Sequence, residues 1–281
     1  MKDLAVLIPS YNDTSSLVET LSSIDEQDNS FTVVVVDDGS VEPVQIDTSN
    51  YGFGIEVIRL DKNAGIVSAL NAGLEYISSK GFDYTARLDA ADLNRPNRFA
   101  TQYEFLRTNQ NIAMVGSNVV FRDETSREPI FTTNLPTTPR ETNRWIDFRN
   151  CFIHPSVMFR NSVLDKTGVY DDRFPHIEDY VLFSRIVGVA DTANLETPLV
   201  DCFVRQNGIS LKNEKAQLLS GLKFKLTRPQ PFRLLWYAFI AKRLSYLVIP
   251  LKVRTKAKLW LGFASSAPRQ LSEATPVTPH L

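Results

Sequence analysis

The chain has 281 residues, of which 43% are hydrophobic and 22% charged, a globular balance that excludes a disordered chain. This length suits one large domain with an appendage or two small domains. The two cysteines, Cys151 and Cys202, exclude a disulfide framework and predict a reducing compartment, and the net charge of −1 hides a strong asymmetry along the chain.

Short apolar runs alternate with amphipathic stretches, which predicts an α/β fold with a mostly parallel sheet flanked by helices. The run before Pro9 is too short for a signal peptide and predicts a first strand. In chain order, we expect a strand over Leu4–Ile8, a helix over Ser15–Ile24, strands over Phe31–Val36 and Ile55–Leu60, a helix over Ile66–Ile77, a strand over Tyr84–Leu88, a helix over Asn97–Arg107, strands over Ile112–Val120 and Ser156–Arg160, and a helix over Glu178–Val187.

Polar residues follow the first strand in the segment LIPSYND. Pro9 is expected to end the strand, which would place Ser10 and Tyr11 at its carboxyl end, where ligands bind in open α/β sheets. The Tyr11 ring could stack on a base. A plain strand-to-helix turn with a helix cap explains the same residues equally well.

Two further segments are candidates for contact with a nucleotide. In VVVVDDGS, Asp37 ends a strand and could accept a hydrogen bond from a base, although Asp38 and the glycine after it also form a good turn. In KNAGIVSALNAG, small residues allow a helix N-terminus to approach a phosphate. The glycine spacing is not that of the dinucleotide fingerprint, and close packing of a helix on the sheet is the alternative.

Two pairs of acids are candidates for chemistry. Asp89 and Asp92, in ARLDAADLNRP, could hold a divalent ion against a diphosphate, or could form a solvated loop that caps the next helix. Glu178 and Asp179, in HIEDYVLFSR, could include a general base, or could stabilise the first turn of a helix. The three histidines have no metal-ligand spacing, and no Ser/His/Asp triad is legible.

Taken together and in order, the segments resemble family 2 glycosyltransferases with the GT-A fold, of the bacterial type that builds surface polysaccharide and lipopolysaccharide. They are LIPSYND, VVVVDDGS, NAGIVSALNAG, RLDAADLNRPNRF, IAMVGSNV, HPSVMFR, GVYDDRF and EDYVLFSR, and the resemblance covers about residues 3–212. It implies a mixed, mostly parallel central sheet flanked by helices. It also implies inverting transfer of a sugar from a nucleoside-diphosphate donor, with UDP favoured, to a hydroxyl of a glycan or lipid-linked acceptor.

The resemblance also implies roles for individual residues. The nucleotide-sugar contacts would come from Pro9, Ser10, Tyr11, Asp37, Asp38, Asn63, Gly65 and Asp89, with Asp37 on the base and Asp38 supporting its turn. Asp179 matches the family's catalytic base, and His154 and Glu178 are expected on the acceptor side.

Two departures concern the metal that the family uses. Ala91 stands where the family has the second acid of its metal motif, and Asn207 stands where many relatives have a histidine. Asp89, with Asp92 or Asn207, could still hold Mg²⁺ or Mn²⁺. Weak metal binding, catalysis without metal, and a catalytically silent nucleotide-sugar-binding scaffold are the alternatives. A nucleotidyltransferase would need a Gly/Lys-rich phosphate loop, and LIPSYND is not one.

The charge asymmetry separates a basic C-terminal segment from an acidic body. Residues 1–220 hold 20 Lys+Arg and 31 Asp+Glu, whereas residues 221–281 hold 11 Lys+Arg and one acid. Leucines and aromatics alternate with basic residues over 233–260, but the longest uncharged runs there have eight residues, too few to span a bilayer. The segment could lie on an anionic membrane, or could be a helical pair packed on the catalytic domain.

We therefore expect a catalytic domain over 1–220, a basic amphipathic helical segment over 221–264 and a disordered tail over 265–281. The protein is expected in the cytoplasm, at the inner face of the plasma membrane if the segment binds lipid. No recognition motif supports a nucleic-acid partner.

Overall fold

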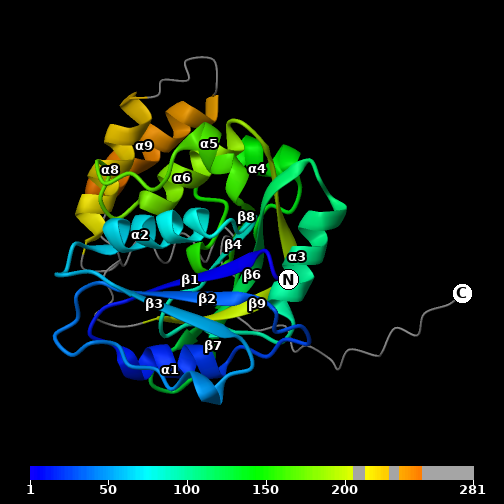
Figure 1. Cartoon of the computed structure of the whole chain (residues 1–281). Coiled ribbons are helices and arrows are strands. Elements are labelled where there is room, and N and C mark those ends of the chain that lie inside the picture. Colours follow the sequence, from blue (N-terminus) through cyan, green and yellow to red (C-terminus); the bar gives the residue numbers. More distant parts are fainter. Residues whose placement is uncertain (205–212, 228–233, 249–281) are drawn as a thin grey trace, which may run out of the picture.

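The computed structural model describes residues 1–204, 213–227 and 234–248 (Figure 1). The predicted metal ligand Asn207 lies outside the described residues. So do residues 228–233 and 249–264 of the predicted basic segment, and the whole of the predicted tail over 265–281.

Among the described residues, nine strands form one mixed sheet in the order β3-β2-β1-β4-β8-β6-β9-β5, with β7 paired to β6. Strands β3, β2, β1 and β4 are parallel, β8 is antiparallel to both of its neighbours, and β6 and β9 are again parallel. The strands are β1 (Leu4–Ser10), β2 (Thr32–Asp37), β3 (Gly54–Arg59), β4 (Tyr84–Arg87), β5 (Leu93–Asn94), β6 (Ile112–Asp123), β7 (Pro129–Thr132), β8 (Met158–Arg160) and β9 (Asp191–Val204).

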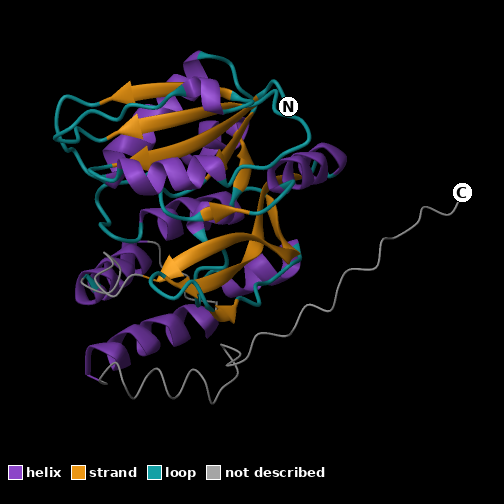
Figure 2. Ribbon diagram, turned by 90° about the horizontal axis from the view of Figure 1, so that it is seen from below, coloured by secondary structure: helices purple, strands orange, loops and turns teal. Residues whose placement is uncertain are grey.

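Helices flank both faces of this curved sheet (Figure 2). They are α1 (Thr14–Ser22), α2 (Ile66–Ser79), α3 (Arg98–Thr108), α4 (Pro139–Trp145), α5 (Leu164–Thr167), α6 (Glu178–Val187), α8 (Glu214–Thr227) and α9 (Leu234–Val248).

The apolar runs of the first strands are continuous because both of their faces are buried. Along β1, Ala5 and Leu7 pack in a core with α2 and α6, whereas Val6 and Ile8 pack in a second core with α1 and α3. Strand β2 alternates in the same way. This two-sided burial is the arrangement that favours parallel strands in α/β folds, and it confirms the predicted fold class.

Every predicted strand and helix is present, and several elements were not predicted: β5, β7, β9, α4 and α5. The longest of these, β9, is interrupted by a change of register to β6 between Leu195 and Pro198. Proline and charged side chains there hide the alternation by which a strand is found from sequence.

Helices α8 and α9 pack on the same side of the sheet as α2 and α6. Phe224 of α8 and Phe239 of α9 are buried in the core that also contains Tyr180 of α6.

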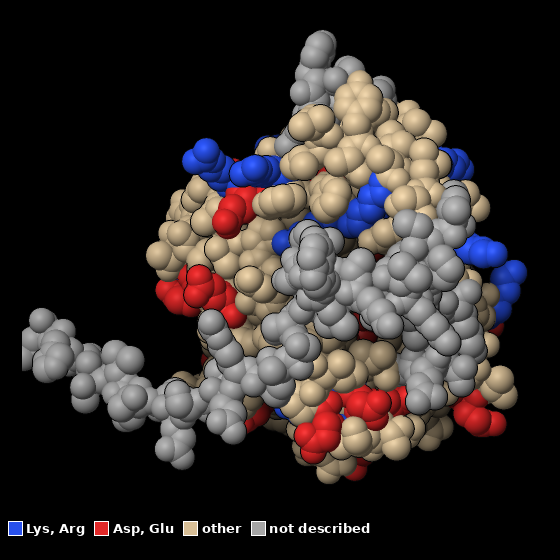
Figure 3. Space-filling model, turned by 180° about the vertical axis from the view of Figure 1, so that it is seen from behind, with Lys and Arg blue, Asp and Glu red and all other residues tan. Residues whose placement is uncertain are grey.

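No helix among the described residues is long and apolar enough to cross a membrane. Figure 3 shows Lys and Arg mainly in the upper half of one face of the molecule, with Asp and Glu at its left side and along its lower edge. The domain limits at 220 and 264 stay a prediction.

Candidate active site

The carboxyl ends of β1, β2 and β4 meet at one edge of the sheet. Ser10 and Asp37 are register partners at the ends of β1 and β2, and Leu7 of β1 is the partner of Arg87 at the end of β4. The Ser10 hydroxyl is buried and has no hydrogen-bond partner within the part of the chain that the structure describes. Because a buried hydroxyl seldom lacks a partner, this atom is a candidate contact for a ligand or an ordered water. The Tyr11 ring beside it is 46% exposed.

Asp37 is a buried carboxylate that holds the turn after β2. It accepts hydrogen bonds from the amides of Ser40 at 2.9 Å and Val44 at 3.1 Å, and it forms a 2.6 Å ion pair with Arg59. Burial alone would raise the pKa of Asp37, but these hydrogen bonds and the Arg59 charge outweigh it and lower the pKa below its usual value. Asp37 is therefore a fixed, ionised acceptor.

Asp38 joins the end of β2 to the start of α2. Its carboxylate accepts from the amides of Ala64 at 2.8 Å and Gly65 at 2.9 Å. Gly39 adopts φ +68°, and a Cβ there would lie 2.3 Å from the Lys62 carbonyl carbon, so only glycine lets the two loops approach so closely. Asn63 is exposed in the same loop. The residues predicted to border a nucleotide thus lie together at one edge.

Arg87 was not singled out from the sequence, although a charged residue in the buried strand of ARLDAADLNRP is unusual. Its side chain is 1% exposed and donates to the carbonyl oxygens of Leu7 and Leu88 and to Asp89. Burial would raise the pKa of Asp89, but the charge of Arg87 and the hydrogen bond that Arg87 donates to the carboxylate act in the opposite direction, and the net shift is downward. Asp89, which is 38% exposed, is therefore an ionised carboxylate at the site.

Asp92 differs from Asp89 although it follows in the same loop. Its Oδ1 accepts from the Phe203 amide at 3.1 Å. Burial, and then the negative charge of Asp89, raise the pKa of Asp92 to about 8. Between the two acids, Ala91 adopts φ +83° and its amide donates to Thr20 Oγ1 at 2.8 Å. No group of three or more His, Cys, Asp or Glu side chains that could hold a metal occurs among the described residues. The metal role of Asp92 stays a prediction.

Glu178 and Asp179 begin α6 at this site. The Asn150 side-chain amide donates to Asp179 Oδ2 at 2.8 Å. Burial, followed by the charge of Glu178, raises the pKa of Asp179 to about 7. Burial also raises the pKa of Glu178, and its Oε2 has no hydrogen-bond partner within the described ranges. A carboxylate poised near neutral pH is suited to general base chemistry.

The half-buried His154 and the buried Tyr170 form a hydrogen-bonded pair near these acids. His154 Nε2 lies 2.8 Å from the Tyr170 hydroxyl. Burial and then the charge of Arg87 lower the pKa of His154 to about 3, so the imidazole is neutral. Burial raises the pKa of Tyr170 well above its usual value. A neutral imidazole and a phenol offer hydrogen bonds to a hydroxyl-bearing ligand without adding charge.

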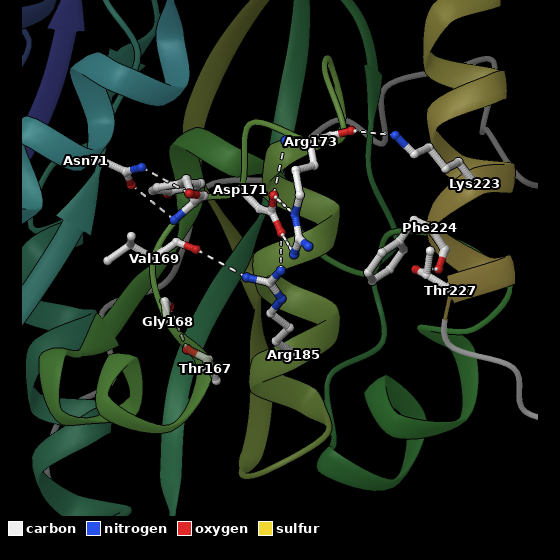
Figure 4. A network of polar contacts seen from close by, with 11 residues as sticks. Asn71, Thr167, Gly168, Val169, Asp171, Arg173, Arg185, Lys223, Phe224 and Thr227 are labelled. Atoms are coloured by element: carbon white, nitrogen blue, oxygen red, sulfur yellow. Dashed lines mark hydrogen bonds and ion pairs between the residues drawn. The ribbon is translucent and has the colours of Figure 1, made fainter.

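The loop that carries Tyr170 is fixed from several sides (Figure 4). The Asn71 side chain of α2 donates to the Tyr170 carbonyl at 3.0 Å and accepts from the Tyr170 amide at 3.1 Å. Asp171 pairs with both Arg173 and Arg185, and Lys223 of α8 donates to the Arg173 carbonyl at 3.5 Å. Tyr170 is therefore held by its neighbours and not by its own loop alone.

The acids from distant parts of the chain act on one another. The charge of Asp89 contributes to the raised pKa values of Asp92, Glu178 and Asp179. Electrostatic coupling of this kind falls off with distance, so Asp89 on the strand side and the two acids of α6 share one site. Sequence reasoning missed Asn150 and Tyr170 there, because neither lies in a repeating pattern or at the end of a predicted strand.

Comparison with known proteins shows the family to which the chain belongs. Residues 5–168 match the family described as glycosyl transferase family 2. The chain is 30% identical over 203 residues to the amylovoran biosynthesis glycosyltransferase AmsE of Erwinia amylovora, with 70% of this chain and 74% of that one aligned. It is 26% identical over 201 residues to the UDP-Gal:alpha-D-GlcNAc-diphosphoundecaprenol beta-1,3-galactosyltransferase of Escherichia coli, with 69% and 68% aligned.

A solved structure shares the fold. The mannosyltransferase PcManGT from Pyrobaculum calidifontis, in complex with GDP-Man and Mn²⁺, superposes with a TM-score of 0.59 at 17% identity. The match covers 92% of this chain and 80% of that one. The common fold therefore extends beyond the residues that the family match covers.

Proposed function

Because the chain belongs to glycosyl transferase family 2 and has the GT-A fold, we propose that it transfers a sugar from a nucleoside-diphosphate donor to a hydroxyl group in the synthesis of a cell-surface polysaccharide, with inversion at the anomeric carbon. The observation that carries this proposal is the environment of Asp179. Its carboxylate is half-buried, is oriented by Asn150 and has a pKa of about 7, and the charge of Asp89 acts on it.

The proposed reaction is a direct displacement. The acceptor hydroxyl oxygen forms a bond to the anomeric carbon as the bond from that carbon to the diphosphate oxygen breaks. Asp179 takes the proton of the attacking hydroxyl, a contribution of about 10²–10⁴-fold for a well-placed base. Attack on the face opposite the leaving group inverts the anomeric carbon. Alignment of the two bound reactants lowers the barrier further.

On the donor side, we assign the nucleotide to the edge formed by β1, β2 and the start of α2. The Ser10 hydroxyl, which has no hydrogen-bond partner in the described part of the chain, and the exposed Tyr11 ring support a contact with the base or ribose. Asp37 would accept a hydrogen bond from the base, and Asn63 and Gly65 would border the diphosphate at the helix N-terminus. A UDP-sugar is favoured, since the name of the Escherichia coli relative specifies UDP-Gal.

A divalent metal fits one of the predicted ligands directly. Asp89 is ionised and 38% exposed, so it can hold Mg²⁺ or Mn²⁺ together with donor phosphate oxygens. Asp92 fits only after it loses the proton that a pKa of about 8 retains at neutral pH. When bound, the metal would stabilise the charge of the departing diphosphate. The mannosyltransferase PcManGT, in complex with Mn²⁺, supports this role.

We further propose that the acceptor is carried on a lipid at an anionic membrane, against which α8 and α9 rest. Leu219 and Leu226 are exposed on one face of α8, and Leu234, Tyr237 and Leu244 are exposed on α9. Residues 221–281 add 11 Lys+Arg and a single acid, which complements anionic headgroups. A diphosphoundecaprenol acceptor is specified in the name of the Escherichia coli relative. The protein would then work at the inner face of the plasma membrane.

A catalytically silent nucleotide-sugar scaffold is the second candidate. Two observations favour it, namely Ala91 in the place of an acid and the high pKa of Asp92. Both weaken the metal site and leave the proposed donor contacts in place.

The test measures donor binding and transfer separately. Thermal shift with a panel of nucleotide sugars, with Mg²⁺, Mn²⁺ or EDTA, identifies the donor through its stabilisation of the folded state. The full chain is then assayed for release of the nucleoside diphosphate and for the product on a polyprenyl-diphosphate glycan. Asp179→Asn should bind the donor as before and lose nearly all transfer. Donor binding without transfer under every metal condition would establish the scaffold, and undiminished turnover by Asp179→Asn would remove Asp179 from the base role.

A further inference from the structure

The segment from Ile146 to Asn150 lies between the C-terminal helices and the proposed base. It follows α4, and its last residue donates the 2.8 Å hydrogen bond to Asp179. Its first residue, Ile146, accepts a hydrogen bond from the Tyr180 hydroxyl at 2.7 Å. The segment is thus bonded at both ends to successive residues of α6.

A buried ion pair ties the middle of this segment to α8. Lys225 Nζ lies 2.9 Å from Asp147 Oδ1, and the two side chains are 5% and 8% exposed. The same ammonium lies 5.4 Å from the ring centroid of Tyr180 and 5.3 Å from that of Phe239 of α9. A buried ion pair is weak evidence for a gain in stability, because desolvation offsets much of the attraction. It is better suited to fixing a unique arrangement of the elements that it joins.

Helix α9 holds the same segment from a second direction. Lys242 Nζ lies 4.3 Å from the ring centroid of Phe148, and the Tyr180 ring stacks on Phe239 at 6.0 Å. Trp236 donates to the Lys225 carbonyl at 3.2 Å, which joins α9 to α8 beside the ion pair. The two C-terminal helices therefore contact the segment before Asn150 and the residue after Asp179.

We infer that α8 and α9 are part of the catalytic apparatus, and that Lys225 and Asp147 are positioning residues that hold Asn150 against Asp179. The inference rests on the proposed role of Asp179 as the base. Without the ion pair, the segment would lose this attachment to α8, and Asn150 would no longer orient the carboxylate. Donor binding on the β1–β2 edge would be left intact, because the ion pair joins α8 to the segment after α4 and not to that edge.

The experiment compares Lys225→Met with Asn150→Ala and with the double variant, using the full chain and steady-state kinetics. We expect Lys225→Met to lower kcat by about ten- to a hundred-fold, as a misplaced catalytic group does, with KM for the donor within about two-fold of wild type. Lys225→Arg, which keeps the charge, should recover most of kcat. The double variant should be no slower than Asn150→Ala alone, because both changes remove one interaction.

Tyr103→Phe provides a control for a general loss of stability. It removes a 2.6 Å hydrogen bond to Asp3 at the opposite edge of the sheet and should lower the melting temperature without changing kcat. If Lys225→Met does not fold, Asp147→Asn replaces it and has the same expected kinetics. An unchanged kcat in Lys225→Met or Asn150→Ala, or multiplicative losses in the double variant, would overturn the inference. Activity in Asp179→Asn would instead overturn the base assignment, so the two failures are distinguishable.

Discussion

Asp38 and Gly65 are joined by a 2.9 Å hydrogen bond from the Gly65 amide to the Asp38 carboxylate. The bond links the end of β2 to the residues just before α2, and the Ala64 amide donates to the same carboxylate at 2.8 Å. The same amides border the proposed diphosphate site. Asp38 thus fixes the residues that precede α2, although it lies at the end of a strand that is distant in sequence.

Asp38→Ala should therefore affect both stability and donor binding. Loss of the carboxylate leaves these two backbone amides without an acceptor, which should cost about 1–3 kcal/mol in unfolding free energy, as urea denaturation would measure. The KM for the donor should rise, because the loop from Asn63 to Gly65 loses its anchor. Asp47→Ala is the matched control, since Asp47 caps a short helix on the exposed surface by accepting from Ser49. Equal effects of the two variants on KM would contradict the role given to Asp38.

Substitutions at Gly39 and Gly81 allow the cost of a left-handed backbone conformation to be measured separately from the cost of a steric clash. Both adopt positive φ, +68° and +74°, but only at Gly39 would a Cβ meet another backbone, 2.3 Å from the Lys62 carbonyl carbon. Gly81→Ala should cost about 1–2 kcal/mol for the left-handed conformation alone. Gly39→Ala should cost clearly more and should also weaken donor binding. Denaturation midpoints for the two variants, with nucleotide titrations, provide the measurement, and a smaller loss at Gly39 would contradict the close approach of the loops.

The pH dependence of transfer should report the Glu178–Asp179 pair. Asp179 acts as a base only when deprotonated, so kcat should fall as the pH drops through its pKa of about 7. After burial, the main cause of that high value is the negative charge of Glu178. Glu178→Gln removes the charge, lowers the pKa of Asp179, and should move the acid limb to lower pH. Glu178→Asp keeps the charge and should leave the limb in place; a limb unmoved by Glu178→Gln would show that another group controls it.

Vesicle co-sedimentation tests the membrane surface. The chain should bind vesicles that contain anionic lipid at low salt, bind less at high salt, and ignore neutral vesicles, because the attraction is screened. Replacing Leu226 and Tyr237 by serine should weaken binding without loss of soluble activity. Val41→Ser, at an 80% exposed valine of the β2–β3 connection, is the control. No binding of the wild type to anionic vesicles would end the membrane proposal.

The fold could be predicted from the sequence where both faces of a strand are buried. Both faces of β1 and β2 are covered, so each strand appears as an uninterrupted apolar run such as FTVVVV. The position of Asp37 followed from the same run, because a polar residue at its end must lie at the sheet edge. The direction of β8 and the course of β9 could not be predicted, since pairing partners far apart in sequence decide them.

The candidate site was predictable only on its strand side. Ser10, Asp37 and Asp89 each follow an apolar run, and their positions are therefore fixed by a local pattern. Asn150 and Tyr170 come from loops whose shape is imposed by contacts with Asp179, His154 and Asn71. Likewise, no sequence pattern distinguishes the raised pKa of Asp92 from the lowered pKa of Asp89, because burial and neighbouring charge decide the difference.

Two hydrogen bonds between the Asn71 side chain and the Tyr170 backbone join two halves of the chain, to which the proposed function assigns different substrates. On the proposed function, the first half selects the activated sugar and the second half selects the molecule that receives it. A gene that exchanged its second half with a relative's could acquire a new acceptor and keep its donor, provided that the incoming loop still accepts this pair of bonds. The Asn71 side chain would then decide which second halves are compatible with this first half, and so which new polysaccharide linkages such an exchange can produce.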